Sequence, residues 1–164
     1  MSLKFSVLLI VFLVGTNSYK SSPAPSGQNQ LSENSKRTLL YLVNQARSKG
    51  CKCGNLRMKP VAAVTWDEQL EAAAEIHSLD MYENGFLSHN GSDGSTFSAR
   101  ITREGFKWSG CAENIAEGYE TEREVIDGWL NSPGHCRNLM SPHYRYMGIG
   151  RVGNYWTQDF AGRQ

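Results

Sequence analysis

The sequence of 164 residues has no hydrophobic run long enough to cross a bilayer as a helix. Its longest apolar segment, Phe5–Val14, is about ten residues, roughly half of what a transmembrane helix needs. It also has no cluster of basic residues, because the formal net charge is +1 and charges of both signs are interspersed. We therefore expect no nucleic-acid partner, no polybasic membrane-binding segment and no membrane span.

The motifs of common hydrolases are also absent. Neither G-x-S-x-G nor H-E-x-x-H occurs in the sequence. Cys136 follows His135 directly, but adjacent side chains rarely face each other, and a disulfide would remove the thiolate that a nucleophilic mechanism requires. The one route to hydrolysis left open is a metal-bound water with Glu113 as its base.

The N-terminal segment has the features of an export signal. Lys4 gives it a positive start, Phe5–Val14 has the length of a signal-peptide core, and the small residues Thr16 and Ser18 precede a cleavage site. We predict a signal peptide over residues 1–18, a flexible linker over 19–30 and one domain over 31–164. The mature chain is expected to be a secreted, extracellular monomer, or a periplasmic one if a bacterium retains it.

An exported chain with an even number of cysteines favours disulfides. The four are Cys51, Cys53, Cys111 and Cys136, and they suggest two bridges. A Cys51–Cys53 bond would close too small a ring. Either of the other two connectivities would tie the region around Lys52 to both ends of the stretch 111–136. A four-thiolate zinc site is the alternative, but C-x-C with two separate cysteines does not match the paired spacing of such sites.

The hydrophobic periodicity predicts helices first and a hairpin last. Residues 147–152 and 155–160 flank Gly153-Asn154, a dipeptide that favours a two-residue hairpin turn. Helices packed over a small antiparallel sheet make an α+β domain. The four expected helices cover residues 32–48, the segment from a capping box at Thr65–Glu68 to Asn84, a short helix from Ser95 or Thr96 to Arg103, and the segment from a capping box at Thr121–Glu124 to Ser132-Pro133.

Six short motifs occur in an order that resembles one family. They are FLSH (86–89), ENIA (113–116), VIDGW (125–129), SPGH (132–135), GIG (148–150) and YWTQDF (155–160). Together they resemble the CAP superfamily of cysteine-rich secretory, antigen 5 and pathogenesis-related proteins, also called the SCP domain, and its bacterial members most of all. The resemblance implies an α-β-α sandwich with the small antiparallel sheet between helices, and an extracellular setting.

The resemblance also implies a polar cleft. The cleft of this family carries two histidines and two glutamates, and His89, Glu113 and His135 match three of them. The second glutamate is missing, because Ser132 stands at its position, and Ala112 replaces the usual glycine before Glu-Asn. Glu124 could reach the cleft, although its place in the capping box explains it more simply. His77 lies on the apolar side of its predicted helix and is expected to be a hydrogen-bonded core histidine.

The predicted function is therefore a binding module with a His/Glu cleft. Two imidazoles and a carboxylate are a common set of zinc ligands, so a divalent metal held by His89 and His135 is one expectation. The resemblance implies two further ligand classes, a sterol or other lipid and an extracellular protein partner. A metal-assisted extracellular hydrolase of the peptidase kind is the alternative.

Overall fold

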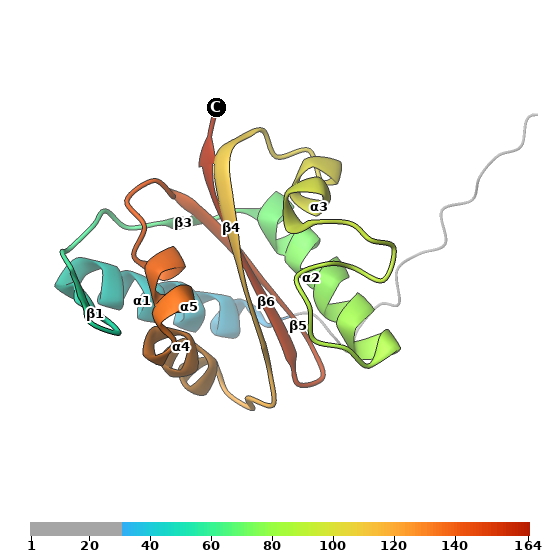
Figure 1. Cartoon of the computed structure of the whole chain (residues 1–164), viewed down its shortest axis with the longest axis horizontal. Helices are drawn as coiled ribbons and strands as arrows, with labels where there is room; N and C mark the ends of the chain where they lie inside the picture. The colour runs from blue at the N-terminus through green and yellow to red at the C-terminus, as the bar shows by residue number, and fades with distance from the viewer. Residues whose placement is uncertain (1–30) are drawn as a thin grey trace, which may run out of the picture.

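The computed structural model of the protein describes residues 31–164 (Figure 1). The predicted signal peptide (1–18) and linker (19–30) lie outside the described residues. Within the described part, no helix has the length and apolar character needed to cross a membrane. The elements are α1 (Glu33–Lys49), β1 (Cys51–Cys53), β2 (Leu56–Met58), β3 (Thr65–Trp66), α2 (Glu68–Asn84), α3 (Phe97–Arg103), β4 (Trp108–Glu117), α4 (Glu122–Asn131), α5 (Pro133–Leu139), β5 (Tyr146–Val152) and β6 (Tyr155–Arg163).

A four-stranded sheet in the order β3-β5-β6-β4 forms the middle layer. Helices α1, α4 and α5 lie on one side of it and α2 and α3 on the other (Figure 1). The α+β class and the α-β-α sandwich are thus confirmed, and the hairpin of β5 and β6 turns at Gly153-Asn154 as predicted. The sheet is antiparallel apart from β3, a two-residue edge strand that pairs parallel to β5.

The larger core fills the space between the sheet and helices α1 and α4. Strand residues alternate in direction, so Met147 and Ile149 of β5 face this core while Gly148 and Gly150 face α2. Burial of these apolar side chains supplies the main stabilisation of this layer. Its central members are Leu39 and Val43 of α1, Val125, Ile126 and Trp129 of α4, and Trp156 and Phe160 of β6.

The opposite layer depends on glycine. A Cβ atom at Gly148 would lie 2.0 Å from the backbone nitrogen of Glu71, and one at Gly150 would lie 2.2 Å from that of Glu75. The backbone of β5 therefore packs directly on the backbone of α2. This contact explains the GIG motif and fixes α2, which carries His77, against the sheet.

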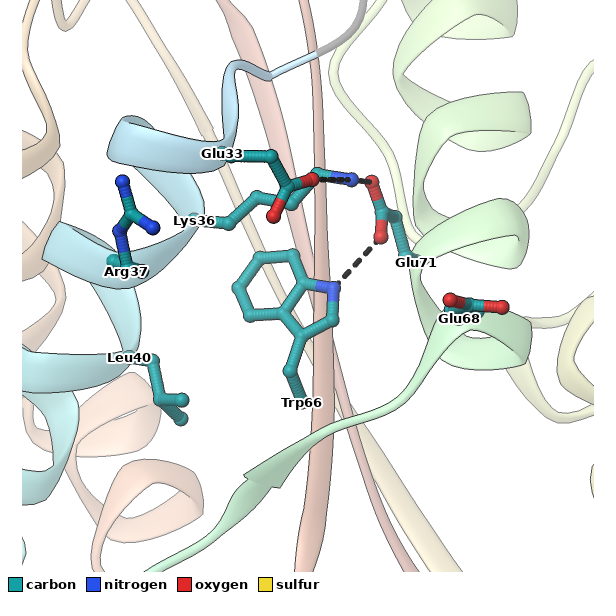
Figure 2. Close-up of a pocket in the computed structure, with 7 residues that line it drawn as sticks. All are labelled: Glu33, Lys36, Arg37, Leu40, Trp66, Glu68 and Glu71. Atoms are coloured by element: carbon teal, nitrogen blue, oxygen red, sulfur yellow. Dashed lines mark hydrogen bonds and ion pairs between the residues drawn. The ribbon is translucent and has the colours of Figure 1, made fainter.

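Two polar anchors attach α1 to the rest of the domain. Arg47 is fully buried and donates hydrogen bonds to four backbone carbonyls, those of Ala62, Leu139, Ser141 and Tyr144, at 2.7–3.1 Å. At the other end, the ammonium of Lys36 lies 2.5 Å from Oε1 of Glu71, whose Oε2 accepts from the Trp66 indole at 2.7 Å (Figure 2). Buried charges are tolerated here because each one has partners.

Two helix starts differ from the sequence prediction. The predicted capping box at Thr65 is wrong, because Thr65 and Trp66 are extended and pair with β5. The carboxylate of Asp67 caps α2 instead and accepts hydrogen bonds from the backbone N–H groups of Gln69 and Leu70. The capping box at Thr121 and Glu124 is confirmed. Pro133 ends α4 as expected but also opens α5, since proline fits the first turn of a helix.

The glycine contact gives a prediction about stability. Gly148→Ala should lower the free energy of unfolding by about 3 kcal/mol or more, because its Cβ would meet backbone that cannot move aside. Gly134→Ala is the matched control. Apart from its chain neighbours and the backbone of α5 itself, no atom of residues 31–164 lies within 4 Å of a Cβ at Gly134, so alanine should be neutral or slightly stabilising there. Urea denaturation of both variants measures the difference, and equal stabilities would contradict the packing described.

Candidate functional site

Glu113 lies in β4, the edge strand beside β6, and its side chain is buried. Its register partner on β6 is Asp159, which in turn pairs with Gly148 of β5. Paired residues of antiparallel strands point to the same face of a sheet. Both carboxyl groups therefore lie on the face that α2 and α3 cover.

Both oxygens of Glu113 have basic partners. Nδ1 of His89 donates to Oε1 at 2.7 Å, and Nη2 of Arg100 donates to Oε2 at 2.6 Å. Nε2 of His77 lies 4.0 Å from the same Oε2. Charge-assisted hydrogen bonds of this kind compensate the cost of burying a carboxylate. Glu113 of β4 thereby links Arg100 of α3 to His89, which lies in the segment after α2.

Arg100 is the functional residue that sequence reasoning missed. It is 4% exposed, and besides Glu113 it donates to the backbone carbonyls of His89 at 3.1 Å and Ser95 at 2.9 Å. One guanidinium thus fixes both the buried acid and the segment that carries His89. The signal that could have found it is the spacing of Phe97, Arg100 and Ile101, which puts the arginine on the buried side of α3.

His89 connects this buried network to the surface. Its side chain is 51% exposed, whereas that of Glu113 is fully buried. Because Nδ1 donates to the carboxylate, the neutral ring keeps its lone pair on Nε2. No hydrogen bond from a described residue uses that Nε2, so it is available to a ligand.

His135 lies on α5, on the other side of β4. Its backbone carbonyl accepts from Nδ2 of Asn114 at 3.3 Å, and Asn114 faces the opposite way from Glu113. Burial and, secondly, the nearby charge of His89 lower the pKa of His135. The His135 ring is therefore neutral at physiological pH.

The predicted trio is not a set whose ligand atoms all lie within 4.8 Å of one another. Among residues 31–164, Cys51, Cys53 and Cys136 are the one set of three histidine, cysteine or acidic side chains whose ligand atoms all lie within 4.8 Å of one another. His89 and Glu113 are in contact as the cleft requires. His135 on α5 does not complete such a set with them.

Asp159 is the second acid of the site. It is completely buried, and neither of its oxygens has a hydrogen-bond partner among the described residues. Burial raises its pKa well above the usual range, the neighbouring Glu113 raises it further, and Arg100 opposes both. The sequence analysis did not single out Asp159. It considered Glu124, which caps α4, as a replacement for the family's second glutamate, whose position is taken by Ser132 before α5.

His77 is the core histidine that its helical position predicted. It is fully buried in α2, and its Nε2 donates to the backbone carbonyl of Ser88 at 2.7 Å. Burial lowers its pKa, which Glu113 and the hydrogen bond to Ser88 partly offset. The neutral His77 ring therefore holds the backbone at Ser88, the residue directly before His89.

The cysteines form one disulfide in the described structure and not the two that were predicted. Cys53 is bonded to Cys136, so β1 is tied to α5. Cys51 and Cys111 are free thiols. Cys111 cannot join the others because it lies on the same face of β4 as Glu113 and packs with residues of the α2–α3 layer. Burial raises the pKa of Cys111 to about 11, with added contributions from Asp159 and Glu113.

Comparisons with known proteins identify close relatives in bacteria. Residues 40–160 match the cysteine-rich secretory protein family, CAP. The uncharacterized protein YkwD of Bacillus subtilis is 36% identical over 100 residues, which are 59% of this chain and 38% of YkwD. The uncharacterized membrane protein YlbC of the same organism is 33% identical over 103 residues, 63% of this chain and 30% of YlbC. The chain thus spans about a third of the length of these relatives.

Solved structures agree with this match. An extracellular protein containing a SCP domain from Bacillus anthracis superposes with a TM-score of 0.70 at 27% identity, over 84% of this chain and 45% of that protein. An outer surface protein of Borrelia burgdorferi gives a TM-score of 0.71 at 22% identity, over 84% of this chain and 99% of that protein. The second likeness concerns the fold alone.

The buried ion pair predicts a large effect of one substitution. Glu113→Gln should lower the free energy of unfolding by about 3–5 kcal/mol, because Arg100 would keep a buried charge without its counter-charge. Glu83→Gln, at an exposed position of α2, is the control and should leave stability unchanged. Chemical denaturation of both variants is the measurement. A loss no larger than that of the control would show that the pair does not support the fold.

Asp159 predicts a pH dependence. A carboxyl whose pKa is raised in the folded state binds more protons there than in the unfolded chain, so its contribution to stability is lost as pH rises from about 4 through the folded-state pKa. Asp159→Asn should therefore gain stability relative to the parent as pH rises. Urea denaturation at several pH values tests this, with exposed Asp127→Asn as the control. Parallel stability curves for parent and Asp159→Asn would contradict it.

Proposed function

The chain belongs to the cysteine-rich secretory protein (CAP) family, and from this membership we propose that it is a secreted binding protein whose ligand contacts Nε2 of His89. The observation that carries the proposal is the hydrogen bond between Nδ1 of His89 and Glu113. It orients a half-exposed imidazole and leaves its second nitrogen as an acceptor. His135, whose neutral ring is carried by α5, is the proposed second contact.

Among the expected ligand classes, a divalent cation such as Zn²⁺ fits this pair of imidazoles best. Histidines that bind zinc typically donate their other ring nitrogen to a carboxylate, as His89 does to Glu113. Glu113 would then act behind the ligand and not as one. Two imidazoles are fewer protein ligands than the three of catalytic zinc sites, so water or a bound molecule would have to complete the shell.

A sterol or lipid is less well supported at this site. The hollow beside the site, which His77 and Arg100 line but His89 does not, has a volume of about 300 Å³. Pockets for apolar ligands are lined mainly by hydrophobic side chains. This one is lined chiefly by polar and charged groups, among them Asp80, Glu83, Asp93, Arg100 and Arg103. An extracellular protein partner remains compatible with the exposed edge of His89.

Hydrolysis has the weakest support of the predicted activities. A general base needs a free oxygen within reach of the proton that it abstracts. Both oxygens of Glu113 are occupied by His89 and Arg100, and Cys136 is held in a disulfide. The proposal is therefore a binding module and not a peptidase.

Calorimetric titration with zinc chloride tests the proposal. The parent should have its disulfide intact and both free thiols replaced, as Cys51→Ser and Cys111→Ser, so that only imidazoles can bind the ion. We expect one equivalent of Zn²⁺ to bind, and His89→Ala and His135→Ala each to abolish binding. His143→Ala, at an exposed loop position, is the control and should bind like the parent. No binding by the parent, or binding unchanged in both variants, would refute a metal site here.

A further inference from the structure

Three sulfur atoms lie together where β1 meets α5. Cys53 is bonded to Cys136, and the free thiol of Cys51 lies 3.5 Å from Sγ of Cys136 and 3.9 Å from Sγ of Cys53. Cys51 and Cys53 are two positions apart on one strand, so both side chains point to the same face. Strand β1 thus presents two sulfurs to the single sulfur of the helix.

We propose that Cys51, Cys53 and Cys136 form a thiol–disulfide exchange site in which Cys51 is the attacking thiol. Cys51 loses its proton to water, and its thiolate attacks Sγ of Cys136. The Cys51–Cys136 bond forms as the Cys53–Cys136 bond breaks. Cys53 leaves as a thiolate and takes up a proton. The step consumes no oxidant and no reductant.

The three cysteines differ in burial, and this difference makes the exchange affect how easily the disulfide is reduced. Cys53 is 2% exposed and Cys136 is fully buried, so a reagent in solution cannot reach their bond. Cys51 is only partly buried and lines a surface hollow. In the Cys51–Cys136 disulfide, the sulfur of Cys51 would face that hollow. Cys51 therefore makes an otherwise protected disulfide reducible.

The hollow indicates the class of reagent. It has a volume of about 490 Å³ and no acidic residue in its lining. A positively charged concave surface concentrates anions. Its four cationic residues are Lys49, Lys52, Arg57 and Lys59. The fitting reagent is a small anionic thiol, such as glutathione, whose thiolate would bond to Cys51 and release Cys136 as a thiolate.

The exchange should depend on pH. Burial raises the pKa of the Cys51 thiol, so only a small fraction is thiolate at neutral pH. The rate should rise by up to about tenfold per pH unit until Cys51 is ionised. Cys111 lies in the other layer and takes no part, so Cys111→Ser can serve as the background for every measurement.

The first test compares rates of reduction by glutathione between pH 6.5 and 8.5. Samples are quenched with acid, and free thiols are alkylated and counted by mass spectrometry. We expect the Cys53–Cys136 bond to be reduced at least about tenfold faster in the parent than in Cys51→Ser, with a gap that widens as pH rises. A variant that merely loosened the fold would be reduced faster. Equal or faster reduction of Cys51→Ser would overturn the proposal.

A second variant tests the alternative bond directly. Cys53→Ser, oxidised in a glutathione redox buffer, should form a Cys51–Cys136 disulfide. Tryptic mapping identifies it, because the cleavage sites at Lys49 and Lys52 isolate Cys51 in its own peptide and Arg137 ends the peptide of Cys136. Two free thiols in the oxidised variant would show that the second pairing cannot form, and would overturn the exchange.

The class of reagent is tested separately. Cys51 should react with the dianionic disulfide DTNB at a rate that falls at least about threefold in Lys52→Glu. Its reaction with uncharged 4,4′-dithiodipyridine should be unaffected by that change. Equal effects on both reagents would refute the preference for anions.

Discussion

The ion pair between Glu113 and Arg100 is the interaction on which the geometry of the site depends. It lies in a fully buried setting where either charge alone would be costly. The same guanidinium binds the backbone at His89 and Ser95, so a buried residue sets the position of the exposed imidazole. The backbone packing of β5 on α2 also supports this arrangement, because it fixes α2 against the sheet face that carries Glu113 and Asp159.

The edge strand β4 connects two chemically different regions. Glu113 faces α2 and α3, while the next residue, Asn114, faces α5 and accepts a hydrogen bond from Asn138 at 2.9 Å. Helix α5 carries His135 and Cys136 side by side. The disulfide that ties this helix to β1 therefore also supports the placement of His135, so the proposed ligand site and the proposed sulfur chemistry share one short helix.

Much of the fold could be predicted from the sequence because its signals are local. The side chain of Ser32 caps α1, the box at Thr121 caps α4, and Gly153-Asn154 makes the hairpin turn. Where local chemistry competed with sheet pairing, prediction failed: Thr65 has the spacing of a cap but extends along β5. The acid beside Glu113 was also missed, because Asp159 becomes its neighbour only through the register of β4 and β6. The predicted second disulfide failed for a similar reason, since Cys51 and Cys111 pack in different layers.

The tautomer of His89 is the most direct test of the account. Nitrogen NMR of the imidazole, at a pH where the ring is neutral, distinguishes a protonated nitrogen from one with a lone pair. The structure predicts a proton on Nδ1, held by Glu113, and a lone pair on Nε2. A proton on Nε2 with a lone pair on Nδ1 would contradict the contact from which the function is inferred.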